Sequence, residues 1–482
     1  MSVRLSELVK RDLSVDPPIQ GVTADSRKVR PGYLFAALPG AKVDGRSFAP
    51  RAVEQGAVAV LAGREIEDLP APLVIAADPR RAYALAAASF WGAQPATCVA
   101  VTGTNGKTSV AAFCRQMFAH AGFRAASMGT LGVRVSAPGS VDEQVTPPGL
   151  TTPDASDVAE LLARVAQSGV THLALEASSH GIDQRRLDGV KLTAAGFLNL
   201  TQDHLDYHGT MGVYRAAKLR LFETLLTRGK TAVLNADSDA YAAFAGAAVS
   251  AGQSVMSVGA AGQGLHLIER TPLPNGQALR LTHQGRAYEV RLPLAGAFQA
   301  SNALVAAGLC IAAGVSIEQA MAGLERIEGA PGRLQRVGRG PRGGEAYVDY
   351  AHTPDGLETV LRALRPHVRG KLIVVFGAGG DRDRTKRPLM GRIAAELADV
   401  AIVTDDNPRS EVPAAIRAEI LAAAAGAREV GDRREAIRTG AALLDEGDIL
   451  VVAGKGHEQG QIVGDVVHPF DDVAETASAL HG

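Results

Sequence analysis

The sequence predicts an α/β protein with three domains, which we place at residues 1–93, 94–330 and 331–482. Its 482 residues are too many for one hydrophobic core, and about three domains is the number expected for this length. From Thr97 onward, short apolar runs alternate with helical stretches, which is typical of mostly parallel sheets covered by helices. One of these runs leads directly into a glycine-rich turn and then a helix.

The N-terminal domain is predicted to be a small α/β domain with short strands and one helix, over Asp78–Trp91. The segment 21–27 resembles a strand that ends in a polar turn. Gln94 and Pro95 mark a linker to the central domain.

The two larger domains are predicted from their apolar runs. The central domain is expected to have strands at Val99–Val101, His172–Glu176, Gly196–Leu200 and Thr231–Asn235. The C-terminal domain is expected to have strands at Ala346–Tyr350, Lys371–Phe376, Val400–Thr404 and Asp448–Val452, with helices at Pro413–Ala424 and Arg433–Leu444. A stretch rich in glycine, residues 329–333, separates the two domains.

Composition excludes several classes of protein. A net charge of −1 gives no broad attraction to nucleic acid or to an anionic membrane. No uncharged apolar run reaches membrane-spanning length, and the first residues lack the apolar region of a signal peptide, so we expect a cytoplasmic protein. Cys98, Cys114 and Cys310 each lie among apolar residues, which predicts buried, reduced thiols.

The segment Gly103-Thr104-Asn105-Gly106-Lys107-Thr108-Ser109 follows an apolar strand and opens a helix. Backbone N–H groups of such a loop bind phosphate oxygens, the lysine reaches the outer phosphates, and the threonine can hold Mg²⁺. The usual pattern has a glycine five residues before Gly106, where this chain has Val101. The order of strand, Gly-Lys-Thr and helix still predicts a phosphate-binding loop rather than an ordinary turn.

Two further segments of the central domain follow predicted strands. Glu176 ends one strand, where a magnesium ligand or water-orienting carboxylate is expected beside a phosphate loop. His204 and His208 are spaced i, i+4, but the Glu of an HExxH motif is missing, so a magnesium or phosphate contact by His204 is favoured over zinc. Ser178-Ser179-His180 lacks the Gly-x-Ser-x-Gly context of a hydrolase, so hydroxyls that bind substrate or cap a helix are expected there.

In the C-terminal domain, three predicted strands run into polar loops, at residues 377–384, 405–409 and 454–458. If the sheet is parallel, these loops meet at one edge and form a pocket with arginines, acids and an amide. Arginine forks bind carboxylates, while Asp406, Asn407 and Glu458 can accept hydrogen bonds from an ammonium group, so the pocket fits a small zwitterion. A dinucleotide fold at Gly377-Ala378-Gly379 is disfavoured, because Arg382 stands at the third glycine position.

The whole chain resembles the Mur ligase family, the ATP-dependent amide-forming enzymes of bacterial cell-wall synthesis. The motifs that carry the resemblance are TGTNGKT (102–108), EASSHG (176–181), NLTQDHLDYH (199–208), Asn302 after GAF (296–298), GRL (332–334) and DYAHTP (349–354). The resemblance implies a central P-loop, parallel-sheet ATPase domain, a Rossmann-like C-terminal domain and an N-terminal domain that binds UDP.

Within this family the loop Asp406-Asn407-Pro408-Arg409 is similar to that of members that add meso-diaminopimelate to UDP-N-acetylmuramoyl-L-alanyl-D-glutamate. Diaminopimelate has a second carboxylate that lysine lacks, and Arg409 is a suitable partner for it. The resemblance implies that ATP converts the side-chain carboxylate of D-glutamate into an acyl phosphate, which the amine then attacks. A lysine-adding or folylpolyglutamate-type ligase is the nearest alternative. An ATP-driven switch or motor protein and a non-catalytic sugar-nucleotide module are alternatives from other classes.

The resemblance also implies residue roles. The implied ATP contacts are Gly103, Thr104, Asn105, Gly106, Lys107, Thr108, Ser109, Asn302, Arg333 and Asp349; the implied catalytic residues are Lys107, Glu176, His204 and Lys218. Two Mg²⁺ ions are implied at Thr108, Glu176, His204 and a carbamylated Lys218. The implied contacts to the UDP-muropeptide are Ala24, Ser26, Thr151, Thr152, Ser178, Gln184 and Arg186; those to diaminopimelate are Arg382, Asp406, Asn407, Pro408, Arg409, Gly454 and Glu458. Leu150 stands where some members have an asparagine. A monomer is expected.

Overall fold

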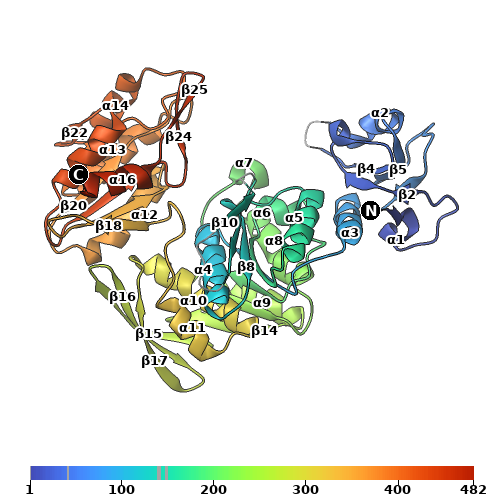
Figure 1. The fold of residues 1–482 in the computed structure, drawn as a ribbon, viewed down its shortest axis with the longest axis horizontal. Helices are drawn as coiled ribbons and strands as arrows, with labels where there is room; N and C mark the ends of the chain where they lie inside the picture. The colour runs from blue at the N-terminus through green and yellow to red at the C-terminus, as the bar shows by residue number, and fades with distance from the viewer. Residues whose placement is uncertain (1, 41–42, 138–142, 147–149, 482) are drawn as a thin grey trace. The chain divides into compact units, whose positions relative to one another are not determined.

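The computed structural model describes residues 2–40, 43–137, 143–146 and 150–481. It divides into two compact units. Helices and strands are mixed along the whole chain (Figure 1). The first unit comprises Met1–Ser257 and Gly308–Ser316, and the second comprises Val258–Ala307 and Ile317–Gly482.

The N-terminal part of the first unit contains a small parallel sheet in the order β3-β4-β5-β6. Its strands are β3 (Gly21–Thr23), β4 (Tyr33–Ala37), β5 (Ala57–Ala62) and β6 (Leu73–Ile75), preceded by the pair β1 (Val3–Arg4) and β2 (Pro18–Ile19). The predicted helix is confirmed as α3 (Pro79–Trp91), capped by Asp78. The expectation of a single helix is wrong, because α1 (Leu5–Val9) and α2 (Ala49–Glu54) also form. Each is too short to show a helical repeat of apolar residues.

The central sheet of the first unit has the strand order β10-β9-β8-β11-β7-β12-β13-β14. These strands are β7 (Thr97–Thr102), β8 (Ala125–Gly129), β9 (Gly132–Ser136), β10 (Glu143–Thr146), β11 (His172–Glu176), β12 (Ala194–Phe197), β13 (Thr231–Asn235) and β14 (Ser254–Gly259). Strands β8, β11, β7, β12 and β13 are parallel to one another, which confirms the predicted topology of the central part. The antiparallel additions β9 and β10 were not predicted.

The predicted strand at Gly196–Leu200 is wrong in its position, since β12 ends at Phe197. Pairing of β12 with β7 stops at Phe197 opposite Thr102, where β7 itself turns into the phosphate loop. The backbone then leaves the sheet, and the Asn199 carbonyl accepts a hydrogen bond from the Thr104 N–H. Residues 198–200 therefore lie against the phosphate loop rather than in the sheet.

Helices pack against this sheet. They are α4 (Lys107–His120), α5 (Ala155–Gln167), α6 (Ser179–Asp183), α7 (Leu205–His208), α8 (Met211–Arg220), a π-helical turn (Leu221–Leu225) and α9 (Tyr241–Ser250). Helix α4 lies beside β8 (Figure 1) and begins at Lys107, as predicted. Cys98, Cys114 and Cys310 are buried and none of them forms a disulfide, which confirms the prediction of reduced thiols.

The second unit contains an antiparallel arrangement of β15 (Leu265–Leu273), β16 (Gly276–His283) and β17 (Arg286–Leu292). Helices α10 (Ala297–Ala312) and α11 (Ile317–Leu324) follow along the chain. The C-terminal sheet has the order β18-β19-β23-β20-β21-β22. Its strands are β18 (Gln335–Arg339), β19 (Glu345–Asp349), β20 (Leu372–Phe376), β21 (Val400–Val403), β22 (Arg428–Glu429) and β23 (Ile449–Ala453).

Helices cover both faces of this C-terminal sheet. Along β20, Leu372, Val374 and Phe376 pack with α12 (Pro354–Leu364), α13 (Lys386–Leu397) and α14 (Pro413–Leu421). The alternate residues Ile373 and Val375 pack with α15 (Arg433–Ala442) and α16 (Asp472–His481). Burial on both faces explains why these strands are continuous apolar runs, which made them predictable. A hairpin of β24 (Gly460–Val463) and β25 (Val466–Pro469) completes the unit.

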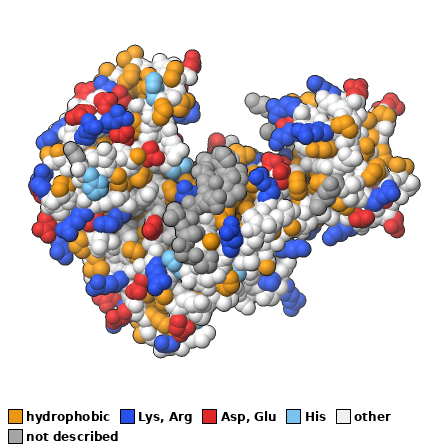
Figure 2. Space-filling view, in the orientation of Figure 1, with side chains coloured by type: hydrophobic (Ala, Val, Ile, Leu, Met, Phe, Trp, Pro, Cys, Tyr) orange, Lys and Arg blue, Asp and Glu red, His pale blue; other side chains and the backbone are white. Residues whose placement is uncertain are grey.

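The surface mixes charges of both signs. Figure 2 shows Lys and Arg side chains interspersed with Asp and Glu side chains over the visible face. Within the described ranges, each helix is too short or too polar to cross a lipid bilayer.

Candidate active site

The phosphate loop is held between the end of β7 and the start of α4. Gly106 adopts a φ of 91° at the N-cap of α4, a conformation that favours glycine. The Asn105 N–H donates to Oδ1 of Asn199 at 2.9 Å, and Asn199 Nδ2 donates back to the Asn105 carbonyl at 3.2 Å. The loop following β12 thereby fixes the shape of the phosphate loop at the N-terminus of a helix, where anions bind.

Two lysines meet at this loop. Lys107 Nζ donates to the carbonyls of Gly103 and Thr104 at 2.8 Å each, and Lys218 Nζ donates to the same Gly103 carbonyl at 2.7 Å. Lys218 is only 1% exposed and lies 4.6 Å from the ring centre of Tyr214. Burial, reinforced by the nearby Lys107, holds the pKa of Lys218 well below its ordinary value. The site thus contains an amine that is driven toward its neutral, nucleophilic form.

Glu176 ends β11 and is buried, with 3% of its surface exposed. Its Oε2 accepts from Thr108 Oγ1 at 3.1 Å, and its Oε1 accepts from the Thr130 N–H at 2.8 Å. A Cβ at Gly129 would lie 2.1 Å from Glu176 Oε1, so only glycine fits beside this carboxylate. The threonine hydroxyl and the carboxylate are oxygen donors of the kind that Mg²⁺ prefers, and they lie at the phosphate loop.

The predicted histidine pair separates in the structure. His208 is buried, and its Nε2 lies 3.0 Å from Ser179 Oγ, whereas the His204 side chain is 45% exposed. His204 has a φ of 52°, and its ring centre lies 4.9 Å from that of His180. Among the residues that the structure describes, no three or more His, Cys, Asp or Glu side chains form a group that could hold a metal. An ion at Thr108 and Glu176 can draw further ligands from phosphate and water, as Mg²⁺ commonly does.

Four of the predicted muropeptide residues lie together. Arg186 Nη1 donates to the Thr152 carbonyl at 2.6 Å, and its Nη2 donates to Gln184 Oε1 at 2.7 Å. Ser178 Oγ donates to Thr152 Oγ1 at 2.9 Å and accepts from the Gly181 N–H. Ser178 therefore caps α6, which confirms the prediction of a helix-capping hydroxyl in this segment. Burial lowers the pKa of Arg186.

The remaining muropeptide residues lie in two places. Thr151 Oγ1 is 3.1 Å from Thr130 Oγ1, and Thr130 in turn donates its N–H to Glu176. Ala24 and Ser26 follow β3 in the small sheet, where Ser26 opens a 3₁₀ turn capped by Asp25. Leu150 is 62% exposed.

Three predicted ATP residues, Asn302, Arg333 and Asp349, lie in the second unit. Asn302 Nδ2 donates to Gln299 Oε1 at 3.1 Å, and Gln299 Nε2 donates to the Arg333 carbonyl at 3.0 Å. The Asp349 carboxylate accepts from the N–H groups of Leu334 at 2.6 Å and Ala351 at 2.8 Å. Burial raises the pKa of Asp349 to about 6, against the opposing effect of Arg333.

Strands β20, β21 and β23 are parallel, which confirms that their three polar loops leave the same edge of the sheet. Asn407 joins two of the loops: its Nδ2 donates to Glu458 Oε2 at 3.0 Å, and its Oδ1 accepts from Lys455 Nζ at 2.7 Å. Asp406 is 7% exposed, and its Oδ2 has no hydrogen-bond partner among the described residues. A Cβ at Gly454 would lie 2.4 Å from that oxygen. An unpartnered, buried carboxylate oxygen on the residue before Asn407 is suited to accept from a ligand ammonium group.

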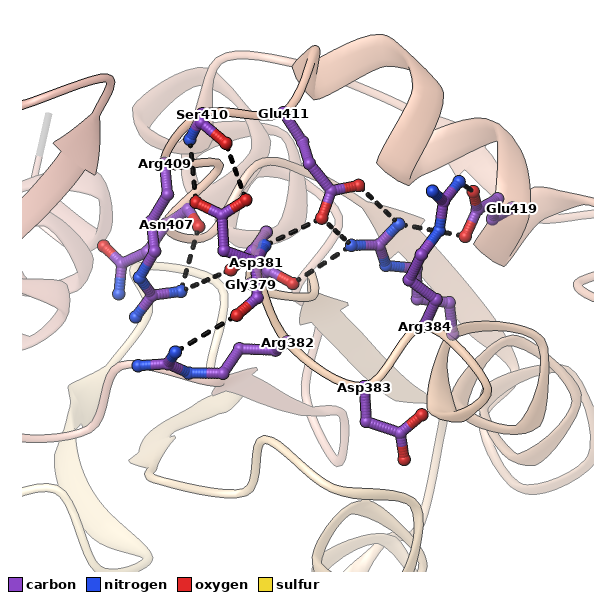
Figure 3. A network of polar contacts seen from close by, with 12 residues as sticks. Gly379, Asp381, Arg382, Asp383, Arg384, Asn407, Arg409, Ser410, Glu411 and Glu419 are labelled. Carbon is purple, nitrogen blue, oxygen red and sulfur yellow. Dashed lines mark hydrogen bonds and ion pairs between the residues drawn. The ribbon is translucent and has the colours of Figure 1, made fainter.

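The arginines of this edge lie on neighbouring loops (Figure 3). Arg409 follows Pro408 with a φ of 53°, and its Nη1 donates to the Gly380 carbonyl at 2.9 Å. Arg382 donates through Nη1 to the Asp381 carbonyl at 3.1 Å. A Cβ at Gly379 would lie 2.8 Å from Arg409 Nη1 and 3.9 Å from Arg382 Cγ, so both side chains approach this glycine.

Sequence reasoning missed several residues that shape these sites. Thr130 and Gly129 surround the Glu176 carboxylate, Tyr214 lies against Lys218, and Lys455 orients the Asn407 amide. A Gly-Thr pair directly after an apolar run could have indicated the first two, since ligand-binding residues follow the carboxyl ends of parallel strands. Lys455 lies in the predicted polar loop at residues 454–458, although no role was assigned to it, and Tyr214 shows no such pattern.

Comparison with known proteins gives matches along most of the chain. Family models described as "Mur ligase family, catalytic domain", "Mur ligase middle domain" and "Mur ligase, glutamate ligase domain" match residues 18–88, 101–310 and 332–456. A UDP-N-acetylmuramoyl-L-alanyl-D-glutamate–2,6-diaminopimelate ligase from Caulobacter vibrioides is 71% identical over 483 residues, covering 100% of this chain and 99% of the relative. The ligase of that name from Agrobacterium fabrum is 54% identical over 462 residues, covering 96% of this chain and 93% of the relative.

Solved structures give the same picture. A structure of a ligase with the same name has a TM-score of 0.77 and 35% identity, and covers 100% of this chain and 99% of its own. The MurF ligase from Thermotoga maritima in complex with ADP shares the fold, with a TM-score of 0.61 and 17% identity over 95% of this chain and 96% of its own.

Proposed function

Because this chain belongs to the Mur ligase family, we propose that it is the ligase that adds meso-diaminopimelate to the D-glutamate of UDP-N-acetylmuramoyl-L-alanyl-D-glutamate, at the expense of ATP, in peptidoglycan precursor synthesis. One observation carries the choice of amino acid. Asp406 Oδ2 and Glu458 offer acceptors for an ammonium group, while Arg409 and Arg382 lie on loops at the same sheet edge. The second carboxylate of diaminopimelate is what distinguishes it from lysine, and an arginine fork is its natural partner.

In this proposal the triphosphate binds at Gly103–Ser109, with Lys107 on the outer phosphates and Asn302, Arg333 and Asp349 as further contacts. Lys107 Nζ already lies at this loop, so its charge is available to phosphate oxygens that displace its contact with the Gly103 carbonyl. Charge placed where phosphate charge develops lowers the barrier to transfer.

We place two Mg²⁺ ions here, with Thr108, Glu176, His204 and a carbamylated Lys218 as the protein ligands. Bound Mg²⁺ neutralises phosphate charge and orients the transferring group. Thr108 and Glu176 hold their oxygens 3.1 Å apart, and the depressed pKa of Lys218 favours the neutral amine that carbamylation requires. Glu176 is kept in place by Thr130.

The reaction then proceeds in two steps. A side-chain carboxylate oxygen of D-glutamate attacks the γ-phosphorus, the bond to ADP breaks, and an acyl phosphate forms. The amine of diaminopimelate, held by Asp406, Asn407 and Glu458, attacks the acyl carbon, loses a proton, and expels phosphate. Arg382, Pro408, Arg409 and Gly454 complete its site, and positioning the amine ahead of water accounts for much of the rate.

The proposal extends to the remaining contacts. Thr151, Thr152, Ser178, Gln184 and Arg186 bind the muropeptide, while Ala24 and Ser26 bind the uridine nucleotide. We propose three domains, at 1–93, 94–330 and 331–482, in a cytoplasmic monomer that binds neither nucleic acid nor membrane.

Phosphate release from ATP tests the proposal. The protein is incubated with UDP-muramoyl dipeptide alone, with meso-diaminopimelate, with L-lysine and with L-glutamate. We expect release that requires the dipeptide and is supported by meso-diaminopimelate far better than by the other two amino acids. Preference for lysine or glutamate would support a sibling ligase, and release without the dipeptide would support a switch or motor protein.

A further inference from the structure

Two loops of the C-terminal sheet each hold a residue in the left-handed region. Asp381, in the loop after β20, has a φ of 52°, and Arg409, in the loop after β21, has a φ of 53°. Such values are uncommon outside glycine and persist where the surroundings enforce them. The contacts between the two loops explain both residues.

Each loop uses a side chain to bind the backbone of the other (Figure 3). The Asp381 carboxylate accepts from the Ser410 N–H at 3.1 Å and from Ser410 Oγ at 2.6 Å, while Arg409 Nη1 donates to the Gly380 carbonyl at 2.9 Å. The backbones come so close that a Cβ at Gly380 would lie 1.9 Å from the Pro408 carbonyl oxygen. Hydrogen bonds from Ser410 also lower the pKa of Asp381, so the carboxylate stays ionised.

Glu411 adds a third connection. Its Oε1 accepts from the Asp381 N–H at 2.7 Å, and its carboxylate pairs with Arg387 at 2.8 and 3.0 Å. The Arg387 side chain is fully buried at the start of α13 and also pairs with Glu419 at 2.9 Å. The two loops are thereby tied to each other and to a rigid helix. We call Asp381, Ser410 and Glu411 the clasp.

The clasp leaves part of Arg409 available. Among the described residues, Arg409 makes its side-chain hydrogen bonds through Nη1 alone. Its Nε and Nη2 remain for a ligand, and these two donors point along one edge of the guanidinium, as bidentate binding of a carboxylate requires.

On the basis of the proposed function, we propose that Asp381, Ser410 and Glu411 are positioning residues that aim Arg409 at the second carboxylate of diaminopimelate, so that discrimination against L-lysine depends on them. None of the three needs to touch the ligand. They act by fixing the backbone and the guanidinium of Arg409 before the amino acid binds, which reduces the cost of ordering the site.

The principal test is Asp381→Asn. Asparagine has nearly the same size and tolerates a positive φ, so the loop keeps its conformation while losing the charge and one acceptor for Ser410. We expect KM for meso-diaminopimelate to rise roughly tenfold, with kcat and the KM values for ATP and UDP-muramoyl dipeptide changed less than about twofold. The ratio of kcat/KM for meso-diaminopimelate over L-lysine falls accordingly.

Asp383→Asn is a matched control. Asp383 lies two residues further along the same loop and also accepts from an N–H and a hydroxyl, at 2.9 and 2.6 Å. Both donors belong to Thr385 of its own loop, so this contact does not reach Arg409. We expect Asp383→Asn to keep the wild-type KM and discrimination ratio.

A double variant tests whether the effect passes through Arg409. In an Arg409→Ala background, Asp381→Asn should cause no further loss of discrimination. An equal loss in both backgrounds, an equal loss from Asp383→Asn, or a parallel rise of KM for all three substrates would overturn the inference. Wild-type protein that fails to use meso-diaminopimelate would overturn the proposed function as well, so the two failures are distinguishable.

Discussion

Lys218 and Lys107 show how one residue can have a role that its sequence context hides. Lys218 occurs in an unremarkable stretch of helix α8, yet its amine is buried against Tyr214 and shares the Gly103 carbonyl with Lys107. A buried amine with a neighbouring cation is costly to protonate. It persists here beside a phosphate-binding loop, as expected of a functional residue.

Removing Lys107 should abolish ligation. Lys107→Ala deletes the charge nearest the outer phosphates, and we expect kcat/KM for ATP to fall by on the order of a thousandfold or more, while the circular dichroism spectrum stays native. The exposed Lys191→Ala is the control and should keep full activity. Persisting turnover in Lys107→Ala would contradict the assignment of the phosphate loop.

Lys218 should also make stability depend on pH. Its folded-state pKa lies below the unfolded value, so the unfolded chain takes up a proton that the folded chain resists, and this opposes folding as the pH falls. In bicarbonate-free buffer, Lys218→Met should therefore be more stable than wild type near neutral pH. The difference should shrink as the pH rises toward about 10.

Urea unfolding across this pH range measures the difference. The exposed Lys230→Met serves as control, with no trend expected. A difference between Lys218→Met and wild type that is independent of pH would show that Lys218 is protonated in the folded protein.

At the scale of the helix and strand, a buried ion pair supports the loop at residues 454–458, where we propose that diaminopimelate binds. Arg433 at the start of α15 pairs with Asp472 at the start of α16, with both side chains fully buried and contacts of 2.6 and 2.7 Å. Arg433 Nη2 also donates to the Ala453 carbonyl at the end of β23. This pair therefore joins two helices to the strand that leads into Gly454.

Breaking this pair should destabilise the second unit. Asp472→Asn leaves a buried guanidinium without its counter-charge, which typically costs about 3–5 kcal/mol in the free energy of unfolding. Differential scanning calorimetry should show one unfolding transition shifted to lower temperature. The Arg434–Glu475 pair joins the same two helices but is open to solvent, with side chains 50% and 19% exposed. Glu475→Gln is therefore the matched control and should shift the transition far less than Asp472→Asn does. An unshifted transition in Asp472→Asn would contradict this role.

The elements that the sequence predicted best are those with a strong local pattern. Strands β20 and β23 are apolar on both faces, and the phosphate loop combines glycine, lysine and a helix start. Antiparallel β9 and the short helix α1 gave no comparable pattern. Within the site, the clasp escaped prediction because Asp381 and Ser410 are 29 residues apart and become neighbours only through the parallel pairing of β20 with β21.

At the scale of the whole molecule, the proposed residues divide between the two units. Lys107, Glu176 and Lys218 belong to the first unit, while Asn302 and Arg409 belong to the second. Amide formation requires both sets to serve the same carboxylate, because the acyl phosphate must meet the amine before water does. We therefore propose that the two steps are coupled: the acyl phosphate forms at the phosphate loop of the first unit, and the amine that attacks it is bound by residues of the second unit.

Isotope transfer tests this coupling most directly. UDP-muramoyl dipeptide is labelled with ¹⁸O in the side-chain carboxylate of D-glutamate and incubated with ATP, Mg²⁺ and meso-diaminopimelate. If an acyl phosphate forms and the amine expels phosphate from it, each amide formed is accompanied by one inorganic phosphate that carries one ¹⁸O atom. Amide formation with unlabelled phosphate would contradict the account.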